Sequence, residues 1–361
     1  MTSNQTSTSQ ITWDFGTAYE FFVSLHVLHT PEHHGVRASW AAGVRSRIPA
    51  TERKLLEEVI PFIAPPLDWI YRLPQPKDAL SALYTLRQIP AAERFNRIFM
   101  ENQEHHTEDE YFNLLKTIAQ KSTWNQADLQ AMRKIMGKKD KVKYNDENIG
   151  RFLDWWSRPA DLGEGYLSAL QAYQQAFFEE EEKRVAPVLK KGLENAQQLA
   201  KKLSTPQLLT ELSQGVQFTE NVLAKSLIIA PAYWTTPLVM YRDLDETTTL
   251  ILFGARPANM ADIPGELVPD DLLRKLKALA DPTRLKILRY LSQEELMPSE
   301  LARRLHLRAP TVTHHLSELR LAGLVNLRLQ GQEKRYTARQ EALQNAFELL
   351  HGFLTAQSEE N

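Results

Sequence analysis

The sequence contains no cysteine and only 14 glycines among its 361 residues. The lack of cysteine excludes disulfide scaffolds, thiolate metal sites, iron–sulfur clusters and cysteine nucleophiles. Neither of the Gly-rich phosphate-binding patterns GxGxxG and GxxxxGK[ST] occurs, and the serine-hydrolase pattern GxSxG is also missing. We therefore expect no cofactor, no metal ion and no catalytic residue, and we predict that the chain is not an enzyme.

Long apolar segments are also missing. No uninterrupted apolar run reaches the roughly 18 residues that a membrane-spanning helix needs. The first ten residues, MTSNQTSTSQ, are polar and lack the apolar centre of a signal peptide. We expect a disordered N-terminal tail and a cytoplasmic protein without a membrane partner.

The net charge of −2 conceals an uneven distribution. Residues 270–339 hold 14 basic and 8 acidic side chains, a local charge of +6, and the rest of the chain carries −8. A basic module joined to an acidic body indicates that only the basic part meets a polyanion such as a nucleic acid.

The composition favours helix, because Leu, Ala, Glu, Gln, Lys and Arg dominate. We predict a mostly α protein with a helical N-terminal domain, residues 1–257, that includes a small β element near 226–256. Pro187 should kink or break the long helix predicted for 161–203. Two prolines and a glycine in 258–269 indicate a linker, and a second domain follows over 270–356.

The second domain begins with two predicted helices and continues with two more. Asp281 and Pro282 are typical of a helix start, because the carboxylate can cap free N–H groups and proline fits the first turn. Short helices then start at Pro298 and Pro310, with a tight turn between them. The second carries small polar residues in its first turns, which is typical of a helix-turn-helix whose second helix approaches DNA closely.

Strand patterns follow this pair of helices. Val325, Leu327 and Leu329 alternate with polar residues, a turn lies at 330–333, and KRYTA returns as a second strand. Gly323 is expected to end the helix before the first strand, because glycine readily adopts the left-handed conformation that terminates helices. A strand–turn–strand after a helix-turn-helix is a wing, and a last helix is predicted for 339–355.

This order of elements resembles the ArsR family of winged-helix repressors. The resemblance is carried by LKALADPTRLKILRYL, SELARRLHLRAPTVTHHLSELRLAGLV and the QGQEKRY turn and strand, over about 270–356. It implies a homodimeric, sequence-specific regulator whose THHL helix enters the major groove of double-stranded DNA. The long N-terminal part is similar to ArsR-type regulators that carry an added domain of unassigned role.

The sequence departs from the family's metal sensors. Their Cys-x-Cys is replaced by ELMPSEL, with Met297 and Ser299, and the last helix offers only His351 with Glu348 nearby. Neither metal site of the family is therefore expected. Ala309 and Pro310 replace the usual polar residue before the THHL stretch.

We expect two sets of functional residues. The predicted DNA contacts, from the second helix of the pair and the wing, are Arg308, Thr311, Thr313, His314, Ser317, Arg320, Arg328, Lys334 and Arg335. The predicted dimer contacts, on the first and last helices of the domain, are Leu272, Leu276, Phe347, Leu350 and Leu354. His315 should instead pack in the core of the helix-turn-helix.

Other readings remain open from the sequence alone. His26, His29, His33 and His34, joined by His105 and His106, could form a metal site of a metal-responsive regulator. The N-terminal domain could be an enzyme that carries an appended winged helix, or the protein could be an architectural DNA binder without an effector. A small-molecule effector is possible, but its identity does not follow from the sequence.

Overall fold

The structure, a computed structural model, describes residues 10–100, 110–137, 144–261, 267–330 and 333–355. The chain forms two compact units, which we call the helical unit and the mixed unit. The helical unit comprises Asp14–Ala186 and Arg242–Leu250. The mixed unit comprises Met1–Trp13, Pro187–Tyr241 and Ile251–Asn361. We expected the division at 258–269, of which 262–266 lies outside the described residues; the compact units instead group 187–241 with the C-terminal module.

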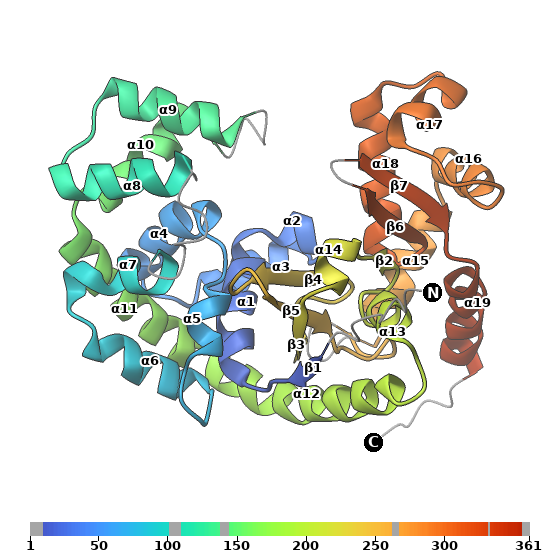
Figure 1. Cartoon of the computed structure of the whole chain (residues 1–361), viewed down its shortest axis with the longest axis horizontal. Coiled ribbons are helices and arrows are strands. Elements are labelled where there is room, and N and C mark those ends of the chain that lie inside the picture. Colours follow the sequence, from blue (N-terminus) through green and yellow to red (C-terminus); the bar gives the residue numbers. More distant parts are fainter. Residues whose placement is uncertain (1–9, 101–109, 138–143, 262–266, 331–332, 356–361) are drawn as a thin grey trace, which may run out of the picture. The chain divides into compact units, whose positions relative to one another are not determined.

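The helical unit confirms the predicted helix-rich body (Figure 1). Residues 1–9, where we predicted a disordered tail, lie outside the described part. No helix among the described residues is both long and apolar enough to cross a membrane. The helices are α1 (Thr17–His29), α2 (Pro31–His34), α3 (Ala38–Arg45), α4 (Ala50–Val59), η1 (Ile60–Phe62), α5 (Leu67–Tyr71), α6 (Ala79–Gln88), η2 (Ala91–Glu93), α7 (Arg94–Phe99), α8 (Glu110–Lys121), α9 (Gln126–Met136), α10 (Asp146–Trp156) and α11 (Pro159–Tyr173).

The predicted helix over 161–203 continues through its proline. A π-helical turn, Gln174–Phe178, follows α11, and α12 then spans Glu179–Ala200 with Pro187 inside it. The expected break at Pro187 is therefore wrong, and the alternative, a kink at this residue, stays a prediction. Val185 and Leu189, on either side of the proline, are fully buried. Packing of the helix face thus outweighs the backbone hydrogen bond that proline removes.

Four strands form the first sheet of the structure, in the order β1-β3-β5-β4. The small β element predicted near 226–256 is present as β3 (Ser226–Ala232), β4 (Val239–Asp243) and β5 (Thr248–Gly254), whereas β1 (Ile11–Trp13) was not expected. β1 runs parallel to β3, with Ile11 opposite Leu227. A three-residue strand is too short for its alternation of polar and apolar residues to be recognised.

The C-terminal part of the mixed unit has the predicted winged-helix order. Its helices are α15 (Asp270–Leu279), α16 (Pro282–Leu291), α17 (Pro298–Leu305), α18 (Ala309–Leu321) and α19 (Gln340–Thr355), and its wing is the antiparallel pair β6 (Val325–Gln330) and β7 (Glu333–Ala338). The expected turn residues Gly331 and Gln332 lie outside the described residues. The preceding part of this unit contributes α13 (Thr205–Leu212), the short strand β2 (Val216–Gln217) and α14 (Glu220–Leu223).

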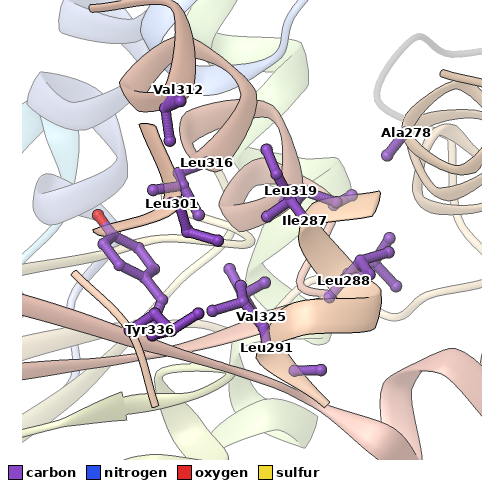
Figure 2. Close-up of a cluster of buried hydrophobic side chains, with 14 of the residues drawn as sticks. Ala278, Ile287, Leu288, Leu291, Leu301, Val312, Leu316, Leu319, Val325 and Tyr336 are labelled. Atoms are coloured by element: carbon purple, nitrogen blue, oxygen red, sulfur yellow. The ribbon is translucent and has the colours of Figure 1, made fainter. Parts of the chain in front are cut away.

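One buried apolar cluster joins these helices to the wing (Figure 2). Leu301 of α17, Leu316 of α18 and Val325 of β6 meet in it, and Tyr336 closes the cluster from β7. Burying one large apolar side chain contributes about 1.5 to 3 kcal/mol, so this cluster fixes the angle between α17 and α18.

The start of α16 gives a first prediction about stability. The Asp281 carboxylate accepts a hydrogen bond of 2.8 Å from the Arg284 backbone N–H, and this bond is the main cause that lowers the pKa of Asp281. Replacing a capping residue with alanine costs about 1 kcal/mol. We therefore expect Asp281→Ala to lower the free energy of unfolding by that amount at pH 7, measured by urea denaturation.

The pH dependence separates the charge of Asp281 from its capping geometry. Because the folded pKa lies below the unfolded value of about 3.9, the stabilisation is complete above that value and is lost as the pH falls through the folded pKa. Asp281→Asn should keep the cap and lose this pH dependence. Equal acid sensitivity in the native chain and the Asn variant would contradict the assignment.

Candidate nucleic-acid interface

The helix-turn-helix is formed by α17 and α18 with a short turn at His306. His306 has a φ of 53°, in the left-handed region, and the Leu307 N–H donates to the Ala302 carbonyl at 3.0 Å. This arrangement ends α17 sharply, and α18 begins at Ala309. Val312, Leu316 and Leu319, at spacings of four and three residues, are buried and orient α18 against the cluster.

The opposite side of α18 is exposed and polar. Thr311, Thr313, His314 and Ser317 all lie on it, as the spacing predicted. The Thr313 hydroxyl donates to the Ala309 carbonyl at 3.0 Å, which leaves its oxygen lone pairs as acceptors for a partner. The structure thus confirms the outward placement of this polar face, and its contact with DNA stays a prediction.

Arg308 lies at the N-cap position of α18 and is exposed. The first N–H groups of a helix have no partner within the helix, and the helix dipole makes this end partially positive. A guanidinium beside such an end suits a phosphate oxygen. Arg308 therefore stays a predicted phosphate contact.

Arg320 requires a correction, because it does not lie on the exposed side of α18. Its side chain is only 8% exposed, and its guanidinium donates to the Ser213 carbonyl at 2.8 Å and the Gln214 carbonyl at 3.2 Å. Burial, with the nearby charge of Arg339, lowers the pKa of Arg320 to about 10, so it stays charged at neutral pH. A guanidinium occupied in this way cannot also contact DNA.

The two carbonyls belong to the end of α13. Ser213 is the C-cap of this helix, and carbonyls at a helix C-terminus lack partners and carry partial negative charge. Arg320 therefore acts as a positioning residue, which holds the C-terminal end of α13 against the recognition helix.

The short strand β2 extends this attachment to the wing. Val216 and Gln217 pair in parallel with Leu327 and Arg328 of β6, and the Leu327 N–H donates to the Gly215 carbonyl at 2.8 Å. Gly215 has a φ of 106°, and a Cβ there would lie 2.6 Å from the Asn326 side chain, so only glycine fits. Residues 205–217 are thus part of the winged-helix sheet and its support, which a two-residue strand did not reveal in the sequence.

The predicted cations of the wing lie on two faces. Arg328 is directly opposite Arg335, and Lys334 is directly opposite Leu329. Because successive residues of a strand point to opposite faces, the two arginines share one face and Lys334 lies on the other. Arg328 is paired with Glu295, and Arg335 is 3.8 Å from Glu333. All three stay predicted DNA contacts, although Lys334 cannot contact the same side of a DNA groove as the two arginines, because it lies on the other face of the wing.

Arg303 is a candidate that the sequence reasoning missed. It is exposed in the last turn of α17, opposite the buried side chain of Leu301. In helix-turn-helix proteins the first helix crosses the DNA backbone, where a guanidinium meets phosphate. The helical spacing of Arg303 from Leu301 was the signal that could have identified it.

His315 lies where the sequence placed it. It is mostly buried, and its Nδ1 is 3.9 Å from the Asp281 carboxylate. This placement makes it a packing residue of the helix-turn-helix and not part of the polar face.

The predicted dimer surface is largely exposed in the protomer. Phe347 and Leu354 of α19 are 67% and 71% exposed, and Leu350 is half-buried. Leu276 of α15 is also exposed, and α15 contacts α19. Leu272 is only 1% exposed, so it packs inside the protomer and cannot form part of a dimer surface. The remaining four residues stay predicted dimer contacts.

The N-terminal histidines do not gather around one point. The rings of His26 and His34 lie 6.0 Å apart and edge to face, and His29 Nδ1 is 2.8 Å from the Leu25 carbonyl. In the described ranges no group of three or more His, Asp or Glu side chains could hold a metal ion. His105 and His106 lie outside the described residues.

Comparison with known proteins assigns the two parts of the chain separately. Residues 281–326 match the family described as "Bacterial regulatory protein, arsR family", and residues 4–229 match a "Family of unknown function (DUF5937)". The second match includes α13 and β2, the segment that supports the wing.

The curated relatives that match do so over about a fifth to a third of this chain. The "Transcriptional activator HlyU" of Vibrio cholerae is 42% identical over 76 residues, which is 21% of this chain and 70% of that protein. The "Biofilm growth-associated repressor" of Agrobacterium fabrum is 30% identical over 107 residues, 29% of this chain and 92% of that protein. A solved structure of HlyU is 36% identical over 24% of this chain and 94% of that chain, with a TM-score of 0.20. Across curated relatives the match covers 55% to 92% of their length.

Proposed function

We propose that this chain, which belongs to the arsR family of bacterial regulatory proteins, acts as a homodimeric repressor. It is a DNA-binding transcription regulator, and its N-terminal part belongs to a family of unknown function. The observation that carries this proposal is the exposed polar face of α18, held outward by a fully packed helix-turn-helix. The named relatives are an activator and a repressor, so the sign of regulation is part of the proposal.

The geometry of one protomer supports a mechanism of DNA binding. The first turns of α18 enter the major groove, where Thr311, Thr313, His314 and Ser317 meet base edges or phosphates. Arg308, Arg335 and the neighbouring wing cations meet phosphates and add affinity without sequence preference. In a dimer, two such helices reach successive major grooves about 34 Å apart, so the operator is an inverted repeat.

The N-terminal part supplies regulation in this proposal, and the protein has no catalytic role of its own. The attachment of α13 and β2 to α18 and the wing supports this assignment of roles. A shift of residues 205–217 would move α18 and the wing directly. The proposed setting is the cytoplasm, where a bacterial regulator meets the chromosome.

Substitutions on α18 and the wing should have different effects on DNA binding. His314→Ala and Thr313→Val should lower the preference for operator over random DNA about tenfold each, because a good base contact is worth about 1 to 3 kcal/mol. Arg335→Ala should weaken binding to all sequences and reduce the salt dependence by about one unit of slope. Competition binding at several salt concentrations measures both quantities.

Lys286→Ala provides the matched control, since it removes an exposed positive charge from α16, outside the two elements tested. It should change neither the operator preference nor the salt slope beyond about a factor of two. If the two α18 variants keep the native preference for operator, α18 is not the recognition helix and the proposal is wrong.

A further inference from the structure

The helical unit contains a partly open, largely apolar cavity that the DNA-binding role does not use. Its volume is about 370 Å³, within the range of small-molecule sites. The wall comes from the proline-rich segment after η1 and from α7, α8, α9 and α10. Among its lining side chains, Phe62, Phe99, Tyr111, Phe112 and Trp156 are aromatic.

The polar atoms of these aromatic walls are already satisfied. The Tyr111 hydroxyl donates to the Phe62 carbonyl at 2.7 Å, and the Trp156 indole N–H donates to the Leu115 carbonyl at 2.8 Å. A ligand therefore meets ring faces and aliphatic groups, which favour a flat aromatic or otherwise apolar body.

Among the described residues, the charged groups that line the cavity are Asp68 and Arg242. The Asp68 carboxylate accepts a hydrogen bond of 3.2 Å from Arg72 Nε, so its charge is balanced within α5 and its C-cap. The Arg242 guanidinium adds a cation to the wall, and its planar shape suits a carboxylate or a similar anion.

We propose that this cavity binds a small amphipathic ligand with an aromatic body and one anionic group, held by the aromatic wall and by Arg242. This inference rests on the proposed function, because it names the class of molecule that the N-terminal part would detect. An apolar body gains affinity by leaving water, and the single guanidinium sets the orientation of the anionic end.

Anilinonaphthalene sulfonate, an anionic aromatic dye, tests this inference on the full chain. Its fluorescence should report one site per chain, and its neutral analogue N-phenylnaphthylamine should bind the same site more weakly. Arg242→Gln should weaken sulfonate binding at least about tenfold, as expected for a charge-assisted hydrogen bond, and leave the neutral dye within about twofold. Arg87→Gln, which removes an exposed positive charge from α6 of the same unit, should change neither.

Substitutions that fill the cavity test whether the dyes bind there or on another apolar surface of the protein. Met136→Trp, and independently Ile98→Trp, place an indole among the lining residues and should abolish binding of both dyes. Two filling variants are used so that a folding defect in one leaves the test intact, with circular dichroism as the check. Dye binding that survives either folded variant overturns the site, and equal loss of both dyes in Arg242→Gln overturns the anionic class.

The same samples distinguish the two proposals. If the native chain binds operator DNA but neither dye, the cavity site is wrong and the proposed regulatory function stands. If the native chain binds the dyes in the cavity but binds no DNA, the proposed function is wrong and the cavity site stands.

Discussion

Replacing both Phe347 and Leu354 with aspartate should convert the protein from a dimer to a monomer and lower operator affinity at least a hundredfold. Both side chains are more than two-thirds exposed in the protomer, so the change leaves the fold of each chain intact. A dimer that buried them would have to bury two unpaired carboxylates per chain instead, which is strongly unfavourable. Linked binding of two half-sites typically raises affinity by about 10² to 10⁴, and a monomer loses this gain.

Light scattering measures the result directly. The variant should have a molar mass of 41.4 kDa and the native chain about twice that value. The matched control replaces Leu80 and Tyr84 of α6, which are 62% and 68% exposed, with aspartate. A native monomer would contradict the proposed dimer, and dissociation in the α6 variant alone would place the interface elsewhere.

Arg320→Ala should lower the free energy of unfolding of the mixed unit by about 2 to 3 kcal/mol. The substitution leaves the carbonyls of Ser213 and Gln214 buried without their donor, and hydrogen bonds to a charged group are worth about 1.5 to 3 kcal/mol each. Part of this gain is offset because the alanine variant no longer buries a charge. Urea denaturation followed by circular dichroism measures the difference.

This variant also decides between the two roles considered for Arg320. If it anchors α13, Arg320→Ala changes stability, and Arg320→Lys recovers part of it because an ammonium can donate to one of the carbonyls. Arg289→Ala, which removes an exposed charge from α16, should change the free energy of unfolding by less than about 0.5 kcal/mol. Native stability with a specific loss of DNA affinity in Arg320→Ala would restore the DNA-contact hypothesis.

The winged helix could be predicted from the sequence because its signals are local. The Asp281–Pro282 start, the spacing of Val312, Leu316 and Leu319, and the alternation in β6 each lie within one element. Periodicity of this kind places side chains on a buried or exposed face, so the outward position of Thr311 and His314 followed from it.

Arg320 and Leu272 could not be placed in the same way, because their partners are distant in sequence. The carbonyls that Arg320 contacts lie 106 and 107 residues earlier, in a helix end whose position only the tertiary structure reveals. Leu272 shares a stripe with Leu276, but packing buries one and leaves the other exposed. The cavity was missed for the same reason, since its walls come from separate helices and a remote arginine.

The central claim, that α18 reads double-stranded DNA, is tested most directly by footprinting the purified native chain across the genome of its source organism at low and at physiological salt. The account predicts a small set of protected inverted repeats whose half-sites lie about 10 base pairs apart, and their loss in the Thr313→Val, His314→Ala double variant. Uniform protection of all sequences, or no protection of any fragment at low salt, would contradict it.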